Sequence, residues 1–247
     1  MPLREEFVSA GNWLFRWRSY LPVVLFVPVV IVTWARAVAG QVPVPDRVWD
    51  LFCLAVSMAG VVVRALAIGS APAGTSGRNT AEGQIASTVN TTGMYSVVRH
   101  PLYVGNFLNW MGVALFPRSA WLALVIALAF WLYYERIMFA EEEFLRGKFG
   151  PAYETWAAET PAFLPDVRRW RAPTLPFSAR NVLKREYSAV FGIVACLTAL
   201  DVVRESAARG EAAIDPMWLV LFTAALVLYL LLRTLKRHTR VLHVEGR

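Results

Sequence analysis

Two polar clusters flank one apolar hairpin in the middle of the chain, and they decide how the rest is organised. The first is Arg99-His100-Pro101-Leu102-Tyr103-Val104-Gly105, and the second is Glu141-Glu142-Glu143-Phe144-Leu145-Arg146-Gly147-Lys148-Phe149-Gly150-Pro151-Ala152-Tyr153. The segment between them is apolar enough for a bilayer or a deep core. Ionisable side chains where hydrocarbon ends are costly, and by default they indicate a functional site. We therefore expect the two clusters to act together.

The composition indicates an integral membrane protein. Of the 247 residues, 57% are hydrophobic and 17% are charged, and the mean hydropathy is +0.44, whereas soluble domains are roughly 45–50% apolar. The net charge of +7 fits basic loops that face anionic lipid better than it fits nucleic acid, so no nucleic-acid partner is expected. Cys53 and Cys196 both lie in apolar runs and are expected to be buried thiols.

Apolar runs of bilayer length predict an all-α integral membrane fold with about six transmembrane or re-entrant helices. A helix needs about 20 apolar residues to span the hydrocarbon layer, and the runs that qualify are 20–39, 49–69, 119–139 and 215–233, with 187–203 as a shorter fifth. The run 102–116 reaches only about 22 Å and carries two asparagines, so we leave open whether it crosses fully. Residues before the first run predict an amphipathic interfacial segment.

The distribution of Lys and Arg predicts the orientation. Most of the 25 basic residues fall on one side if the N-terminus is inside, and the exceptions are Arg36, Arg47, Arg118, Arg204 and Arg209. Because basic loops stay in the cytoplasm, both polar clusters are expected at the cytoplasmic surface. Two clusters that are joined by one hairpin on one side can form one site.

The chain divides into four predicted units. Residues 1–69 hold the N-terminal amphipathic segment and two helices, and residues 70–165 form a core with a polar loop at 70–93. Residues 166–186 are a basic, proline-rich linker, and residues 187–247 are a C-terminal helix pair with a basic tail.

His100 is the residue of the first cluster with the clearest chemical potential. A lone histidine is more often structural than catalytic, but this one lies beside Arg99 and Tyr103. Pro101 fixes the backbone direction after it, and Gly105 would allow a ligand to approach closely. We therefore expect a ligand-binding role for this cluster.

The second cluster is either a solvated helix end or part of the same site. Carboxylates and aromatic rings are groups that would recognise a ligand with a ribose, an amine and a sulfonium. The chain has no G-x-G dinucleotide fingerprint, phosphate loop or G-x-S-x-G elbow, and it has no metal-ligand spacing, so no metal site is expected. What remains is a cofactor site built from loops and helix ends.

The order and spacing of these motifs resemble a known superfamily. Gly93-Met94-Tyr95, the Arg99–Gly105 stretch, Glu141-Glu142, Leu145, Phe149-Gly150, Tyr153, Pro161 and Pro165 are similar to the pattern of isoprenylcysteine carboxyl methyltransferases and phospholipid methyltransferases. The resemblance covers residues 93–165. It implies an integral membrane enzyme that uses S-adenosylmethionine, held between the two clusters.

The resemblance also implies roles for individual residues. The cofactor-binding positions would be Tyr95, His100, Pro101, Tyr103, Gly105, Glu141 and Glu142. The catalytic positions would be Arg99 and His100, with Arg99 near the methyl acceptor or the cofactor carboxylate. The predicted acceptor is an anionic oxygen, carboxylate or phosphate, of a membrane lipid or lipidated substrate.

The chain departs from the superfamily in the polar 70–93 loop and in the two helices after residue 186. The loop is similar to that of bacterial relatives that methylate a lipid A phosphate, which implies a bacterial inner-membrane location. Alternatives are a phospholipid amine N-methyltransferase, an NADPH-dependent membrane sterol-type reductase and a non-enzymatic scaffold or transporter. The reductase pattern fits less well, because Pro101-Leu102-Tyr103 stands where those enzymes have Asn-Tyr, and Asn106 replaces their acid. The sequence leaves the oligomeric state open.

Overall fold

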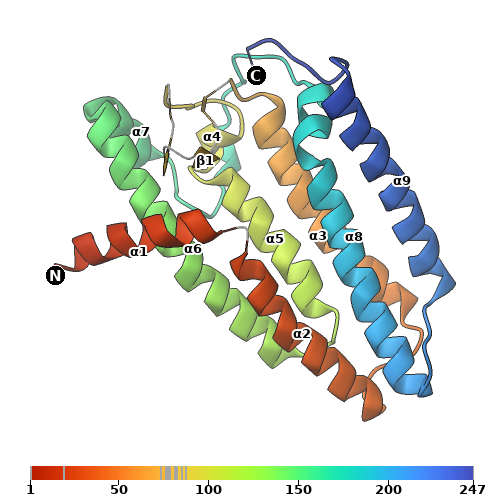
Figure 1. Cartoon of the computed structure of the whole chain (residues 1–247). Coiled ribbons are helices and arrows are strands. Elements are labelled where there is room, and N and C mark those ends of the chain that lie inside the picture. The colour runs from red at the N-terminus through yellow and green to blue at the C-terminus, as the bar shows by residue number, and fades with distance from the viewer. Residues whose placement is uncertain are drawn as a thin grey trace.

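The computed structural model describes residues 2–18, 20–72, 74–75, 79–80, 83–84, 86 and 88–246. The described chain is almost entirely helical (Figure 1), which confirms the predicted all-α class. Its elements are α1 (Leu3–Trp17), α2 (Leu21–Val38), α3 (Arg47–Gly69), β1 (Asn79–Thr80), β2 (Gly83–Gln84), α4 (Met94–Val97), α5 (Pro101–Leu115), α6 (Ala120–Phe149), α7 (Pro151–Glu159), the 3₁₀ turn η1 (Val167–Arg169), α8 (Ala179–Arg209) and α9 (Pro216–His238). The two short strands pair antiparallel.

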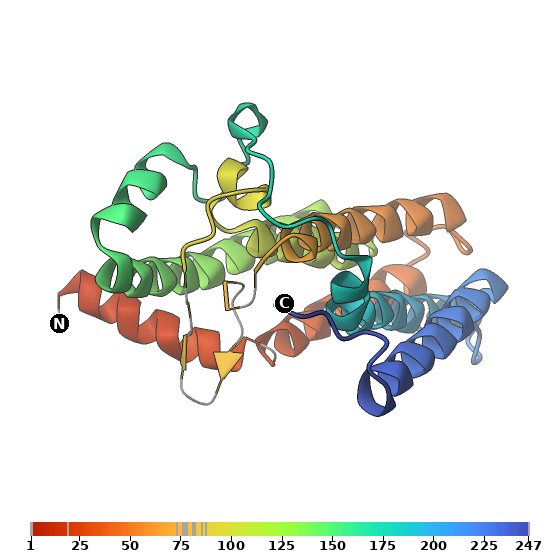
Figure 2. The same ribbon diagram turned by 90° about the horizontal axis from the view of Figure 1, so that it is seen from above.

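The long helices run side by side and form an integral membrane bundle (Figures 1 and 2). In the described part of the chain, α3, α6, α8 and α9 are long and apolar enough to cross a membrane, and Val23–Val38 of α2 is a shorter apolar helix. Helix α5 has 15 residues, so it reaches only about 22 Å. It is therefore the short member of the bundle.

Helix α1 lies across α6 rather than along the bundle (Figure 1). Gly11 makes this crossing possible, because a Cβ there would lie 2.1 Å from the carbonyl oxygen of Arg136 and 2.7 Å from the Cβ of Ala140. At the free end of α1, Arg4 forms an ion pair with Glu143 of α6. The predicted N-terminal segment is thus a helix that is attached to the second polar cluster.

Both ends of the hairpin are defined by local backbone chemistry. Gly150, with φ +52°, ends α6, and Pro151 begins α7, as its missing N–H allows. At the other end, Ser119 occupies the N-cap position of α6, but its side chain accepts no capping hydrogen bond. The turn is stabilised instead by Arg118, which pairs with Asp46 and covers the ring of Trp49 at 4.6 Å.

The segment between α7 and the predicted linker lies over the first polar cluster and holds it by backbone hydrogen bonds. The amide N–H groups of Arg99 and His100 donate to the carbonyls of Pro161 and Ala162, at 2.9 and 3.2 Å. The linker is shorter than predicted, because α8 already begins at Ala179 with Ser178 as its N-cap. Its first turns are polar, so an apolar count could not detect them.

The predicted 70–93 loop is described only in part, and Ser76, Gly77 and Arg78 lie outside the described residues.

Two apolar clusters fill the bundle. One joins α2, α3, α5, α6, α8 and α9 around Phe116, Leu197 and Trp218. The other is largely aromatic and joins Phe15 of α1 with Tyr103 of α5 and Phe130 and Tyr134 of α6.

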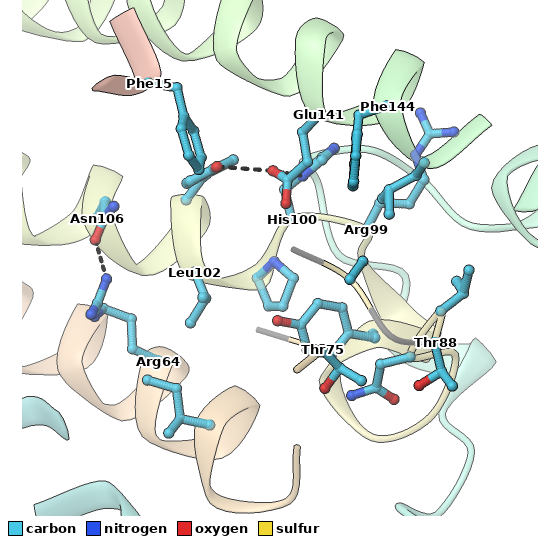
Figure 3. Close-up of a pocket in the computed structure, with 18 of the residues that line it drawn as sticks. Phe15, Arg64, Thr75, Thr88, Arg99, His100, Leu102, Asn106, Glu141 and Phe144 are labelled. Atoms are coloured by element: carbon cyan, nitrogen blue, oxygen red, sulfur yellow. Dashed lines mark hydrogen bonds and ion pairs between the residues drawn. The ribbon is translucent and has the colours of Figure 1, made fainter. Parts of the chain in front are cut away.

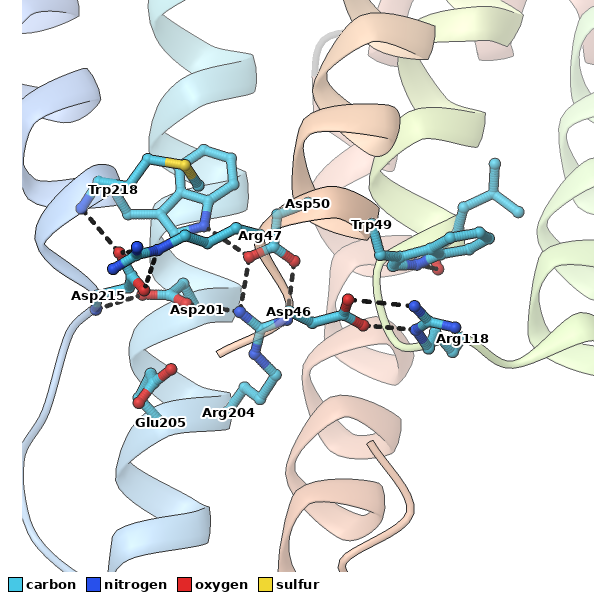
Figure 4. A network of polar contacts seen from close by, with 12 residues as sticks. Asp46, Arg47, Trp49, Asp50, Arg118, Asp201, Arg204, Glu205, Asp215 and Trp218 are labelled. Atoms are coloured by element: carbon cyan, nitrogen blue, oxygen red, sulfur yellow. Dashed lines mark hydrogen bonds and ion pairs between the residues drawn. The ribbon is translucent and has the colours of Figure 1, made fainter. Parts of the chain in front are cut away.

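A buried ionic network ties the C-terminal helix pair to the rest of the bundle, at the end opposite α4 and α7 (Figure 4). Arg204 of α8 donates two hydrogen bonds of 2.7 Å to Asp50 of α3 and one of 2.8 Å to Asp201. Trp218 of α9 donates from Nε1 to Asp50 at 3.0 Å. Asp50 and Arg204 are 0% and 2% exposed, so each charge depends on its partners.

Removing the cation from this network should destabilise the protein strongly. Arg204→Met leaves two buried carboxylates without a counter-charge, and breaking one side of a buried pair costs about 3–5 kcal/mol. The measurement is thermal unfolding in detergent. The control is Arg171→Met, whose partner Glu159 lies 3.5 Å away with both side chains more than half exposed, so that loss should be below about 1 kcal/mol. Equal melting temperatures for Arg204→Met and wild type would contradict the role of the network.

Candidate functional site

The structure brings the two polar clusters together at one cavity of about 450 Å³ (Figure 3). The cavity lies at the end of the bundle that carries α4 and α7. Its wall includes Tyr95, Arg99, His100, Pro101 and Tyr103 from the first cluster and its approach, and Glu141 from the second. Volumes of about 300–1,000 Å³ are usual for small-molecule sites.

His100 connects the two clusters directly. It is the N-cap residue of α5 and is 6% exposed. Its Nε2 lies 2.9 Å from Oε1 of Glu142, and its Nδ1 lies 3.6 Å from Oε2 of Glu141. The imidazole is therefore placed between two carboxylates from the far end of the hairpin.

This position determines the charge of His100. Burial disfavours the imidazolium, but the hydrogen bonds and charges of Glu141 and Glu142 outweigh it and raise the pKa of His100 above its ordinary value of 6.5. Both ring nitrogens of an imidazolium are donors, which suits two carboxylate neighbours. His100 in this state cannot accept a proton.

Tyr103 and Arg99 complete the contact between the clusters. The hydroxyl of Tyr103 donates to Glu141 at 2.9 Å, and its ring stacks on His100 with centroids 5.5 Å apart. Arg99 donates from Nη1 to the carbonyl of Ala157 at 2.9 Å, and its Nε lies 3.2 Å from Glu142. Arg99, His100, Glu141 and Glu142 are thus held by contacts with one another.

Tyr95 and Trp156 add aromatic surface to the cavity. Nε1 of Trp156 in α7 donates to the backbone carbonyl of Tyr95 at 3.2 Å, which attaches α7 to α4. Burial raises the pKa of Tyr95, so its hydroxyl stays protonated at neutral pH. Rings at this place offer their faces to a cation.

Two predicted cofactor positions lie elsewhere than expected. Gly105 is not on the cavity wall but packs against α3, where a Cβ would lie 2.4 Å from Cγ of Arg64 and 2.6 Å from the carbonyl oxygen of Gly60. Its small size allows the close approach of a neighbouring helix, and its predicted role in cofactor binding stays a prediction. Glu142 supports His100 and Arg99 from behind and is not part of the wall.

The structure adds a polar group that the sequence analysis did not select. Arg64 of α3, Asn106 of α5 and Glu186 of α8 also line the cavity. Arg64 donates to both carboxylate oxygens of Glu186 at 2.8 Å and to Oδ1 of Asn106. The sequence signal for Arg64 is a charged residue inside the apolar run 49–69.

A helical membrane bundle with a polar cavity at one end is the architecture of a membrane protein that binds a ligand among its helices. Residues 51–152 match the family model "Phospholipid methyltransferase". A protein-S-isoprenylcysteine O-methyltransferase of Schizosaccharomyces pombe is 32% identical over 75 residues, which cover 30% of this chain and 32% of the relative. These matches assign the segment with the two polar clusters to the isoprenylcysteine carboxyl methyltransferase and phospholipid methyltransferase superfamily, and the predicted resemblance is confirmed.

Two bacterial relatives have other names. The nickel-cobalt-cadmium resistance protein NccN of Alcaligenes xylosoxydans xylosoxydans is 39% identical over 90 residues, or 36% of this chain and 42% of the relative. The cobalt-zinc-cadmium resistance protein CzcN of Cupriavidus metallidurans is 39% identical over 89 residues, or 36% and 41%. The chain therefore matches about two fifths of the length of these relatives. No solved structure matches.

Protonation of His100 should stabilise the protein at low pH. Because the pKa is raised in the folded state, the stabilisation is complete below 6.5, the ordinary value, and is lost as pH rises through the raised pKa. Wild type should thus lose more thermal stability above pH 6.5 than His100→Gln does. Unfolding in detergent at a series of pH values measures this difference. Parallel curves for the two proteins would contradict the charged state assigned to His100.

Proposed function

We propose that this protein is an S-adenosylmethionine-dependent membrane methyltransferase, which transfers a methyl group to an anionic oxygen of a lipid or lipidated substrate. The observation that carries the proposal is the contact of His100 with Glu141 and Glu142, since it joins both superfamily motifs at one cavity. Membership in the superfamily supports a methyl transfer. The basic loops support a cytoplasmic-facing site, which we propose lies in a bacterial inner membrane.

The side chains on the cavity fit S-adenosylmethionine. The carboxylate of Glu141 can accept hydrogen bonds from an amine or from ribose hydroxyls. The rings of Tyr95, Tyr103 and Trp156 can lie against a sulfonium, and Arg99 can pair with a carboxylate. A volume of about 450 Å³ accommodates a nucleoside with an amino-acid chain.

The chain's own residues hold and orient the reactants. The cofactor supplies a methyl group on a positively charged sulfur. His100 holds Glu141 and Glu142 in place, and Tyr103 fixes the remaining orientation of Glu141 through its hydroxyl. Positioning of this kind supplies much of the acceleration of an in-line displacement. An anionic oxygen is already deprotonated, so the lack of a proton acceptor in protonated His100 does not impede the reaction.

The charges on the cavity wall favour an anionic acceptor. Among the described residues, the guanidinium groups of Arg18, Arg64, Arg99 and Arg185 line it together with the carboxylates of Glu141 and Glu186. S-adenosylmethionine has a net positive charge at neutral pH, so its binding leaves the wall more positive still. A carboxylate or phosphate would balance that excess, whereas an amine would have to lose a proton first. Arg99 is the candidate to orient either the acceptor or the cofactor carboxylate.

Substitutions in the two clusters should weaken cofactor binding selectively. His100→Ala and Glu141→Gln each remove one side of the contact, and we expect at least about a tenfold loss of affinity for S-adenosylmethionine, or 1.4 kcal/mol. Calorimetry of the detergent-solubilised protein measures it, with NADPH titrated in parallel. The matched control is Glu143→Gln, because Glu143 pairs with Arg4 and Arg146 away from the cavity. Normal affinity in both variants, or binding of NADPH alone, would overturn the assignment.

The methyl group should be found on oxygen. Membranes that contain the protein are supplied with S-adenosylmethionine labelled in its methyl group, and the extracted lipids are treated with mild base. A carboxyl methyl ester releases the label, and a phosphate methyl ester, which resists longer, is identified by mass. Membranes with His100→Ala serve as the control. Label found only on nitrogen would instead indicate an amine methyltransferase.

A further inference from the structure

The ion pair of Arg64 and Glu186 is unusual in its position. Both residues belong to helices that are long and apolar enough to span the membrane, and Glu186 is 3% exposed. Arg64 lies within the apolar run 49–69, where a charged group is costly and usually marks a functional site, and Glu186 lies in the polar first turns of α8. The pair lines the same cavity as His100 and Glu141.

Measured from the adjacent helix ends, the pair lies about one and a half to two turns inside the bundle. For helices that end at the membrane surface, this depth would be the boundary between lipid headgroups and acyl chains. Arg64 precedes the end of α3 at Gly69 by five residues, which is about 8 Å along the helix. Glu186 follows the start of α8 at Ala179 by seven residues, or about 10 Å. The two helix ends are adjacent, because Asn181 donates from Nδ2 to the carbonyl of Ile68 at 3.0 Å. The headgroup layer on each side is roughly 5–8 Å thick.

Gly105 leaves space for the side chain of Arg64. The stem of Arg64 crosses α5 at Gly105, where any Cβ would meet its Cγ at 2.4 Å and its Cδ at 3.1 Å. Arg64 thereby reaches Asn106, which in turn donates to the hydroxyl of Tyr134 at 3.0 Å. The glycine of the first motif thus fixes a cation at the cavity on the side away from Arg99 (Figure 3).

The contacts of Arg64 leave part of its guanidinium available. In the described part of the chain, Nε and Nη2 donate to Glu186, and Nη1 donates to Asn106. A guanidinium has five N–H groups, so Nη1 and Nη2 each keep one. Such N–H groups can donate to the oxygens of a carboxylate or phosphate. Arg185, the neighbour of Glu186 in sequence, adds positive charge at the same cavity.

We propose that Arg64, held by Glu186, Asn106 and Gly105, forms the acceptor subsite and takes the anionic headgroup, phosphate or carboxylate, of a membrane lipid. The inference rests on the proposed function and specifies where the methyl acceptor binds. The C-terminal helix pair, which the superfamily resemblance did not cover, then contributes Glu186 to the site. The carboxylate of Glu186 partly offsets the positive charge of Arg64 and so lowers the affinity of the subsite for an anion.

The two partners of the pair should have opposite effects on lipid binding. Arg64→Lys loses the planar fork, so it should retain an anionic lipid at least about tenfold less well. Glu186→Gln keeps the shape but leaves Arg64 without its counter-charge, so an anionic lipid should bind several-fold more tightly. A pair with a purely structural role predicts reduced stability in both variants and no change in lipid selectivity.

Native mass spectrometry of the detergent-solubilised full chain measures the retained lipid. The probes are phosphatidic acid, oleate and, as a zwitterion, phosphatidylcholine. Wild type should retain phosphatidic acid or oleate above phosphatidylcholine, and the preferred probe identifies phosphate or carboxylate as the acceptor chemistry. The control is Arg233→Lys, which changes an arginine of α9 that donates to Tyr229 and should bind as wild type does.

Three results would overturn the subsite. They are equal retention of the zwitterion, unchanged selectivity in both variants, and loss of S-adenosylmethionine affinity in Arg64→Lys with lipid retention intact. The last would assign Arg64 to the cofactor carboxylate. Calorimetry of wild type with S-adenosylmethionine keeps the two proposals apart, because lack of cofactor binding refutes methyl transfer without affecting lipid selectivity.

Discussion

The contact of His100 with Glu141 and Glu142 is the interaction on which the site depends. It closes the hairpin of α5 and α6 at its polar end, and Pro161 and Ala162 hold the backbone of Arg99 and His100 on the other side. Two half-buried carboxylates are tolerated beside a buried ring because an imidazolium lies between them. Glu141 is thereby held on the cavity wall, while Glu142 is held behind it by His100 and Arg99.

The two ends of the bundle contain different polar structures, a cavity at one end and a buried ionic network at the other. At one end, charged side chains surround a cavity and present hydrogen-bond donors and acceptors on its wall. At the other, Arg204 satisfies Asp50 and Asp201 in a buried network. The aromatic cluster of Tyr103, Phe130 and Tyr134 packs between α5 and α6 near the cavity. A rigid interior between the two ends is expected to keep the cavity geometry constant while a ligand enters.

The C-terminal helices have two separate connections with the core. Arg204 anchors α8 to α3 at one end, and Glu186 pairs with Arg64 at the other. In the first connection, both terminal nitrogens of Arg204 donate to Asp50 and one of them also donates to Asp201, which explains how the pair is held. The second leaves two N–H groups of Arg64 available, and this gives α8 a place in the proposed acceptor site.

The sequence alone determined the helical membrane class, the approximate spans, the superfamily and the two clusters that meet at the cavity, because hydrophobic runs and motif spacing are local properties. It did not determine that Gly105 faces α3, that α8 begins at Ala179, or that Ser119 makes no capping bond. Nor did it select Arg64, since the value of a charge in an apolar helix depends on which helices pack beside it. Only the packing of α3, α5 and α8 brought Arg64, Asn106 and Glu186 together, because partners more than 40 residues apart are chosen by tertiary contact and not by local sequence.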